Sequence, residues 1–244
     1  MIAAGLTDTG RRRKDNQDNY YINVIHSDEQ ALCVVCDGMG GAKSGNVASD
    51  MTLTIFVSEV KKRMLPKMSL SYMRAICNEA IRAANTYTYD KSITDELLSG
   101  MGSTVVAALA DKKDVCIMNV GDSRAYLINS DGVMQITTDH SVAQEMLRRG
   151  ELTAEEAKHH PSRNYITRAV GTEKTIKPQF YEVHPQKGDV ILLCTDGLSN
   201  MVDENDLSAE VLSGRAPVEC VKRLVALAND RGGPDNITVT MLVF

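Results

Sequence analysis

The chain has 244 residues, with 27 Lys and Arg against 32 Asp and Glu, so its formal net charge is −5. A chain of this length forms one large domain or two small ones and can bury a hydrophobic core. Its 43% hydrophobic and 24% charged residues are typical of a soluble globular protein, and the missing basic excess argues against a nucleic-acid-binding protein. No apolar run approaches the ~20 residues that span a bilayer, and the N-terminus lacks the basic start of a secretory signal. We therefore expect a cytoplasmic protein without a membrane span.

The first elements expected along the chain are two strands and two long helices. β-Branched and apolar residues predict strands at 19–25 and 31–36, and a period of 3.6 residues predicts helices at 47–64 and 70–89. Further strands are expected at 103–110, 113–120, 124–129, 133–137, 180–183, 189–195 and 237–243. Asp131-Gly132 is a hairpin-turn signal between two of them. Thr153 and Glu156 form a capping box for a short helix, and Pro217 opens a last helix that ends at Gly232.

The order of these elements indicates the fold class. Strands, two adjacent helices, many strands, and a final helix and strand lack the regular alternation of a parallel βαβ sheet. We therefore expect an α+β protein with antiparallel sheets and helices packed outside them. The sequence contains no low-complexity linker and no repeat, so residues 1–244 are expected to form a single domain.

Cys33 and Cys36 form a C-x-x-C pair inside the apolar run 31–36. Residues three apart in a strand point to opposite faces, which suits neither a redox pair nor a zinc site. We expect the six cysteines to be small buried residues in a reducing compartment.

Three aspartates follow strand-like segments, and a fourth precedes one. Asp37 and Asp196 each come directly before a glycine at the end of an apolar run, Asp122 follows the run 116–120, and Asp235 precedes the last strand. Carboxylates from separate loops can bind Mg²⁺ or Mn²⁺, which prefer oxygen ligands. Aspartates beside glycine also cap turns, so the spacing alone leaves both interpretations open.

Four consecutive basic residues occupy positions 11–14. In an extended chain Arg11 and Arg13 share a face, and an arginine fork matches a phosphate group. A solvated basic surface explains the same residues, and it is the interpretation that the residues alone favour.

Seven motifs in order along residues 5–243 resemble the bacterial branch of the metal-dependent type 2C (PPM) serine/threonine protein phosphatases. The motifs are Thr7-Asp-x-Gly-x-x-Arg13-x-x-Asn16-x-Asp18, Cys36-Asp-Gly-Met-Gly-Gly41, Gly100-Met-Gly-Ser-Thr104, Gly121-Asp-Ser-Arg124, Asp139-His-Ser141, Cys194-Thr-Asp-Gly197 and Gly233-Pro-Asp-Asn236. The resemblance implies a four-layer αββα sandwich, with two central antiparallel sheets flanked by helices. It also implies a flap at about 141–170, in which His159 or His160 could approach a substrate or simply be exposed.

The resemblance further implies a site with two Mn²⁺ or Mg²⁺ ions and room for a third. Asp37 would bridge the two ions with the Gly38 carbonyl on the second, Asp196 and Asp235 would complete the first, and Asp122 with Asp196 would hold the third. Asp18 would act near the second ion through water, and Arg13 would bind the substrate phosphate.

The activity implied is hydrolysis of phosphoserine and phosphothreonine by a metal-bridging hydroxide. The partners implied are phosphoproteins made by bacterial-type Ser/Thr kinases, and we expect a monomer. Two alternatives differ from this: a catalytically inactive phosphoprotein-binding module on the same fold, and an enzyme for small phosphoesters.

Overall fold

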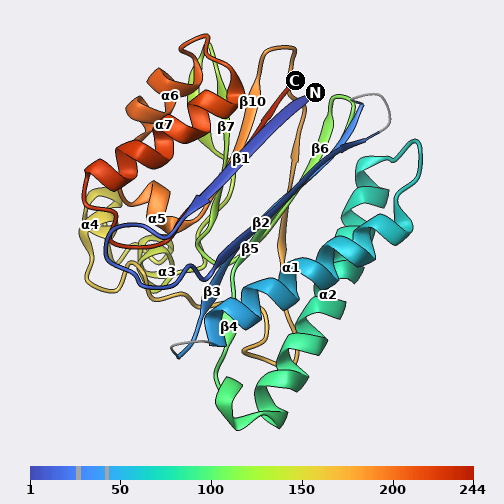
Figure 1. The fold of residues 1–244 in the computed structure, drawn as a ribbon, viewed down its shortest axis with the longest axis vertical. Helices are drawn as coiled ribbons and strands as arrows, with labels where there is room; N and C mark the ends of the chain where they lie inside the picture. Colours follow the sequence, from blue (N-terminus) through green and yellow to red (C-terminus); the bar gives the residue numbers. More distant parts are fainter. Residues whose placement is uncertain (26–28, 42–43) are drawn as a thin grey trace.

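The computed structural model describes residues 1–25, 29–41 and 44–244. These residues form two antiparallel sheets that stack face to face between two layers of helices (Figure 1). The two termini lie next to each other at one end of the sheets. This arrangement confirms the predicted α+β sandwich.

One sheet contains five strands in the order β1-β11-β10-β7-β8. Their bounds are β1 Ile2–Asp8, β11 Ile237–Val243, β10 Val190–Cys194, β7 Arg124–Asn129 and β8 Gly132–Gln135. The predicted turn joins β7 to β8, and Gly132 takes the left-handed conformation there with φ +130°. Strand β1 was not predicted from the sequence, because its small residues Ala3, Ala4 and Gly5 hide the alternation that marks a strand.

The other sheet has the order β2-β3-β5-β6-β9, and a short strand, β4, pairs with the end of β3. The bounds are β2 Asp18–Ile25, β3 Gln30–Met39, β4 Gly102–Ser103, β5 Val105–Asp111, β6 Asp114–Val120 and β9 Gln179–Val183. The residues of β3 from Gln30 to Cys36 are all buried, because the strand is covered on both faces.

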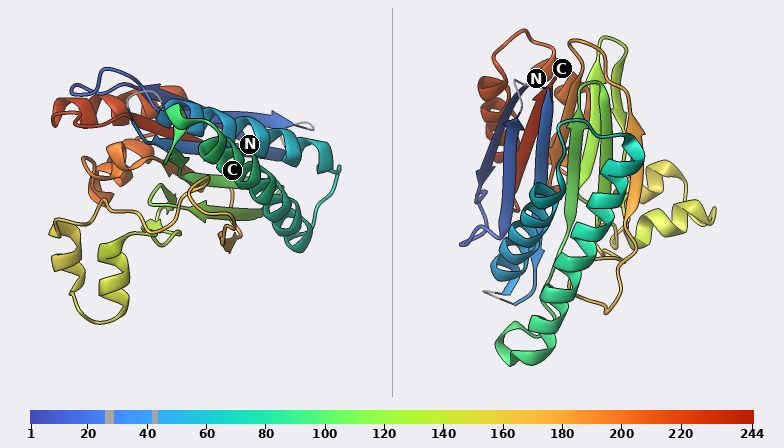
Figure 2. Two further views of the ribbon diagram at one scale, coloured as in Figure 1. Left: turned by 90° about the horizontal axis from the view of Figure 1, so that it is seen from below. Right: turned by 90° about the vertical axis from the view of Figure 1, so that its right-hand side faces the viewer.

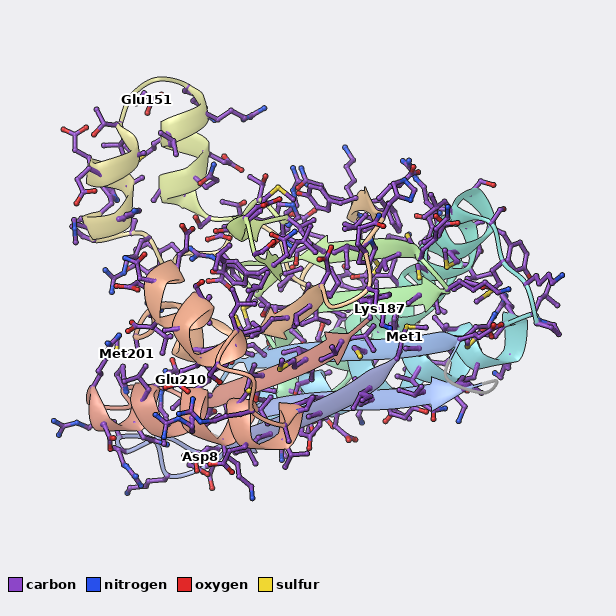
Figure 3. All side chains as sticks on the ribbon, turned by 90° about the horizontal axis from the view of Figure 1, so that it is seen from above. Met1, Asp8, Glu151, Lys187, Met201 and Glu210 are labelled. Carbon is purple, nitrogen blue, oxygen red and sulfur yellow. The ribbon has the colours of Figure 1, made fainter. Side chains whose placement is uncertain are left out.

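Helices cover the outer face of each sheet. The helices are α1 Ser44–Arg63, α2 Leu70–Thr94, η1 Glu96–Leu98, α3 Val142–Arg148, α4 Ala154–His159, α5 Asp196–Ser199, α6 Glu204–Val211 and α7 Pro217–Asp230. Helices α1 and α2 lie on the six-stranded sheet, and α6 and α7 lie on the five-stranded one. Helices α3 and α4 form a hairpin that projects from the body (Figure 2), with Glu151 at its tip (Figure 3). No helix of the described residues is long and apolar enough to cross a bilayer.

Three layers of apolar side chains hold the fold together. One lies between α1, α2 and the six-stranded sheet, one between the two sheets, and one between the five-stranded sheet and α5 to α7. Cys36 belongs to the first layer and Cys33 to the second, which confirms that the C-x-x-C residues point to opposite faces. All six cysteines are free and buried.

Helix α2 shows how the sequence pattern produces the packing. The Ser69 hydroxyl accepts a hydrogen bond from the backbone N–H of Tyr72 and caps the helix. The apolar stripe that the 3.6-residue period predicts for this helix runs from Leu70 to Ala84. Leu70 is half-buried against the core, and each large apolar side chain that is fully buried there contributes about 1.5–3 kcal/mol. The buried members of the stripe are Met73, Ile76, Cys77, Ala80, Ile81 and Ala84. The helix continues to Thr94, five residues beyond the predicted end at 89.

Candidate active site

The aspartates singled out in the sequence meet at one end of the two sheets, around a cavity of about 310 Å³. The residues that line it are Arg13, Gln17, Asp37, Gly38, Met39, Gly40, Thr104, Asp122, Asn164, Ile166, Asp196, Asp235 and Asn236. Both sheets contribute, since Asp37 lies in β3 and Asp196 begins α5, separated by one residue from the end of β10. The convergence of residues 13, 37, 122, 196 and 235 confirms that these stretches come together in space.

The backbone around Asp37 is held by the segment that contains β4. The N–H of Asp37 donates to the Thr104 hydroxyl at 3.0 Å, and the N–H of Thr104 donates back to the carbonyl of Asp37 at 2.8 Å. The Ser103 hydroxyl donates to the same carbonyl at 3.1 Å. These bonds fix the end of β3, so the Asp37 carboxylate projects from a rigid strand rather than a loop.

Gly38 lines the cavity beside Asp37 and must be a glycine. A Cβ atom at this position would lie 2.0 Å from the carbonyl oxygen of Gly45, in the first turn of α1. The backbone of α1 therefore approaches β3 as closely as it does only because Gly38 has no side chain.

Asp196 and Asp235 are brought together by a second close approach. A Cβ atom on Gly197 would lie 1.9 Å from the carbonyl oxygen of Asn236, so the start of α5 packs directly on the loop before β11. The amide of Asn200 donates to the Asp196 carboxylate at 3.1 Å, and the N–H of Asn236 donates to that of Asp235 at 2.8 Å. Each carboxylate is thus oriented by a residue that lies close to it in the sequence.

Arg13 reaches the cavity from the loop between β1 and β2. Its Nη2 atom lies 2.8 Å from Oδ2 of Asp235. Asn236 positions this loop, because its side-chain amide donates to the carbonyls of Thr9 and Asp15 and accepts from the N–H of Gln17. The basic run at 11–14 is exposed, and Arg13 is its member that lines the cavity.

Asp122 is buried in the three-residue loop between β6 and β7. The N–H of Gly121 donates to Nδ1 of His140 at 3.0 Å, so His140 holds the backbone of this loop. Burial raises the pKa of Asp122 to about 8, and the charges of Asp196 and Asp139 add to this effect.

Asp18 lies behind the cavity and not on its wall. It faces Asp37 across the β2–β3 pair, and its Oδ2 atom accepts hydrogen bonds from the hydroxyls of Thr195 and Thr238 in the opposite sheet. Its Oδ1 atom is buried without a hydrogen-bond partner among the described residues. Burial raises its pKa to about 7. This carboxylate therefore joins the two sheets directly beneath the site.

The carboxylates are close enough to disfavour one another's ionisation. Burial, followed by the charges of Asp18 and Asp196, raises the pKa of Asp37 well above its ordinary value. Burial and the charge of Asp235 raise the pKa of Asp196 to about 6. Such a concentration of buried acids is stable in its ionised form only beside cations. Arg124 and Arg13 both oppose the rise in the pKa of Asp196, but Arg124 is already paired with Asp139, and Arg13 is the base among the described residues that line the cavity.

These residues fit hard divalent cations. No three of the described His, Cys, Asp and Glu side chains converge tightly enough to enclose an ion unaided. Mg²⁺ and Mn²⁺ do not require such a cage, because they keep several waters and accept backbone carbonyls. The unpartnered Asp18 oxygen and the raised pKa values indicate a site whose negative charge is not balanced by protein groups alone.

Other residues of the cavity were not identified as site residues from the sequence. Gln17, Met39 and Thr104 belong to the motifs, whereas Asn164 and Ile166 lie in the flap region. Neither flap histidine lines the cavity. His159 is exposed, and its Nε2 atom lies 3.1 Å from Oε1 of Glu155. The Nδ1 atom of His160 accepts a hydrogen bond from the backbone N–H of Ser162. The sequence suggested that a histidine of this segment could approach the substrate, whereas the residue of the segment that lines the cavity beside Ile166 is Asn164.

Comparisons with known proteins agree with this geometry. The chain is 37% identical to the serine/threonine phosphatase stp of Listeria innocua over 242 residues, which cover 99% of this chain and 95% of that protein. The crystal structure of the serine/threonine phosphatase Stp1 from Staphylococcus aureus has a TM-score of 0.92, with 35% identity and coverage of 99% and 94%. The catalytic domain of the phosphatase PstP, solved with two manganese ions, has a TM-score of 0.84, with 31% identity and coverage of 98% and 96%. Residues 9–227 match the family described as Protein phosphatase 2C, and the chain belongs to this family.

Proposed function

We propose that this protein is a metal-dependent serine/threonine protein phosphatase, which hydrolyses phosphoserine and phosphothreonine. The observation that carries the proposal is the convergence of four aspartates and one arginine on a single cavity. The relatives named above are serine/threonine phosphatases, and PstP was solved with two manganese ions. The charge balance of the cavity supports the same conclusion, since it has several acids for one base.

Asp37, with the Gly38 carbonyl beside it, and Asp196 and Asp235 are the residues that we expect to hold two Mn²⁺ or Mg²⁺ ions. Asp122 and Asp196 are the pair that we expect to hold a third ion, since they lie close enough for the charge of Asp196, after burial, to raise the pKa of Asp122. Asp18 is expected to act indirectly, because its carboxylate lies behind Asp37 and is held by two threonine hydroxyls.

The chemistry divides between the cations and the protein side chains. Bound divalent cations lower the pKa of water and neutralise the charge of a phosphoryl group. Arg13 is placed to bind the phosphoryl oxygens through its planar guanidinium, and the carboxylates orient the reacting groups from a rigid frame. The described cysteines are buried in the cores, and burial raises the pKa of Cys36 and Cys194, so they are poor nucleophiles.

The substrates that we propose are phosphoproteins made by bacterial-type Ser/Thr kinases, and the proposed location is the cytoplasm. Six free buried thiols support a reducing compartment. We also propose that the protein acts as a monomer.

Hydrolysis of a phosphothreonine peptide and of an aryl phosphate, with and without Mn²⁺, tests the proposal. Wild-type protein should hydrolyse both with Mn²⁺ and neither after EDTA treatment, and Asp196→Ala should reduce both rates at least about a hundred-fold. Asp131→Ala is the matched control, because Asp131 also precedes a glycine but lies in the exposed β7–β8 turn. Binding of the phosphopeptide without hydrolysis in the presence of Mn²⁺ would instead indicate an inactive binding module.

A further inference from the structure

A second cavity, of about 640 Å³, lies at the end of α2 outside the site described above. We call it the η1 cavity. Its walls are formed by Tyr89, Ser92, Ile93, Asp95, Glu96, Ser99, Gly100, Gly171 and Thr172. Figure 1 shows the C-terminal end of α2 below β4, the short strand that pairs with the end of β3.

The η1 cavity is separated from the catalytic cavity by a thin wall. Met39 lines the catalytic cavity and Thr172 lines the η1 cavity. The Met39 Cε and the Thr172 Cγ2 atoms each lie 2.8 Å from the position that a Cβ atom on Gly102 would occupy. The missing side chain at Gly102 therefore lets the two walls meet.

The backbone also connects the two cavities. Gly171 follows Val170, which exchanges two backbone hydrogen bonds with Ser103 at 2.8 and 3.0 Å. The Ser103 hydroxyl in turn donates to the carbonyl of Asp37. The η1 cavity is thus attached to the same rigid segment that holds Asp37, and its position relative to the catalytic site is fixed.

The charge of the η1 cavity comes from acidic residues. Asp95 is already engaged, since its carboxylate binds Lys91 at 3.0 Å and accepts from the N–H of Leu97 at 3.2 Å. Glu96 is exposed, and in the described part of the chain its side chain has neither an ion pair nor a hydrogen bond. Glu96 is therefore the carboxylate of this cavity that is free to bind a ligand.

Apolar groups complete the wall near Glu96. Tyr89 contributes an aromatic ring and Ile93 an aliphatic side chain, of which 63% of the residue surface is exposed. A carboxylate beside an aromatic and an aliphatic group suits a long cationic side chain, whose stem packs on apolar surface while its charged end pairs with the acid.

We infer that the η1 cavity is a substrate subsite that binds an arginine or lysine side chain of the phosphoprotein, a few residues from the phosphorylated residue. The inference rests on the proposed function, because it identifies the class of phosphoprotein that the catalytic cavity accepts. An extended peptide advances about 3.3 Å per residue, so a substrate chain that crosses the Met39–Thr172 wall enters the second cavity within a few residues.

Paired phosphothreonine peptides test this subsite. The two peptides of each pair differ at one position, which carries arginine in one and glutamate in the other, and the position is moved from two to five residues on either side of the phosphothreonine. For wild-type protein with Mn²⁺, kcat/KM at one or more positions should favour arginine at least about five-fold. Glu96→Lys should abolish or reverse this preference, and Glu96→Gln should reduce it.

Glu79→Lys is the matched control, because it makes the same charge change on an exposed position of α2 outside the η1 cavity. It should keep the wild-type preference. A ratio below about two at every position, a preference that Glu96→Lys leaves in place, or an equal loss in Glu79→Lys would overturn the inference. An aryl phosphate too small to reach the η1 cavity is measured in the same preparations: its hydrolysis without any peptide preference contradicts the subsite alone, whereas the absence of Mn²⁺-dependent hydrolysis contradicts the proposed function.

Discussion

Arg13 and Asp235 form an ion pair, with 2.8 Å between Nη2 of the arginine and Oδ2 of the aspartate. The proposed phosphate-binding group and a proposed metal ligand therefore neutralise each other. Both side chains are partly exposed, at 53% and 32%, so the pair is worth less than about 1 kcal/mol and a ligand of either group can displace it. A cation held by Asp235 would leave Arg13 free for phosphate, which couples the two binding events.

Replacing Arg13 separates its proposed contact with the substrate phosphate from its competition with cations for Asp235. Arg13→Ala should raise the KM for a phosphopeptide about ten-fold or more with a smaller change in kcat, because a contact with the bound phosphate is lost. In the absence of substrate the same variant should bind Mn²⁺ about two- to five-fold more tightly, since a positive charge no longer competes for Asp235. Isothermal titration calorimetry measures the second effect. Arg12→Ala, which changes an exposed residue outside the cavity, should match wild type, and weaker Mn²⁺ binding by Arg13→Ala would contradict the coupling.

Asp37→Asn should lower the rate of hydrolysis and raise the stability of the metal-free protein. The rate with Mn²⁺ should fall at least about a hundred-fold, because the ligand that we propose to be shared by both ions is lost. The melting temperature in EDTA at pH 8 should rise by several degrees, since the substitution replaces a carboxyl group whose ionisation is opposed by burial and by the charges of Asp18, Asp196 and Asp122. Differential scanning calorimetry with and without EDTA tests this expectation. A lower melting temperature of the metal-free variant would show that Asp37 stabilises the fold by itself.

The stability of the metal-free protein should decrease as the pH rises. The pKa of Asp196 is raised to about 6, that of Asp18 to about 7 and that of Asp122 to about 8, against 3.8 in the unfolded chain. The folded state therefore binds more protons than the unfolded state between pH 4 and 8, and its extra stability is lost through this window. Denaturant unfolding in EDTA at pH 5, 6.5 and 8 should show a falling free energy of unfolding. The stabilisation by added Mn²⁺ should grow over the same range, and a metal-free protein most stable at pH 8 would contradict the electrostatic description.

Gly197→Ala should damage the site without touching a proposed ligand. The new Cβ atom would overlap the carbonyl oxygen of Asn236, 1.9 Å away, and must push the Asp235 loop from the Asp196 helix. Overpacking of this kind costs about 1–3 kcal/mol, and we expect weaker Mn²⁺ binding together with a lower free energy of unfolding. Gly41→Ala is the control, because in the described part of the chain the atom nearest to its new Cβ, the Ser44 hydroxyl oxygen, is 3.8 Å away. Equal behaviour of the two variants would show that the close approach has no functional role.

The fold was predictable where periodicity is strong. The apolar stripe of α2 and the alternation of β11 both appear in the sequence, and the structure confirms them. Strand β1 was not predicted, because its small side chains show little alternation between apolar and polar residues. It is held by pairing with seven residues of β11, which lies far away in the chain. The short helices α3 and α5 were not predicted either, since a few residues contain too little of a helical period to detect.

The candidate site was predictable as a set of residues but not as an arrangement. Aspartates after apolar runs suggested ligands, and the order of the motifs pointed to a phosphatase family, whereas the Arg13–Asp235 pair joins residues 222 positions apart. The burial of Asp18 behind the cavity is a property of both sheets, because the hydroxyls of Thr195 and Thr238 reach it from the opposite one. Asn164 in the flap region had no signal of its own, and its place on the cavity wall depends on how the chain returns from α4.

Anomalous diffraction at the manganese edge, from crystals of the wild-type protein grown with Mn²⁺, tests the central claim most directly. Two peaks should appear in the catalytic cavity, with the Asp37 carboxylate touching both and Asp196 and Asp235 touching one. Manganese bound only elsewhere on the surface, or peaks in the cavity that persist unchanged in Asp37→Asn crystals, would contradict the account.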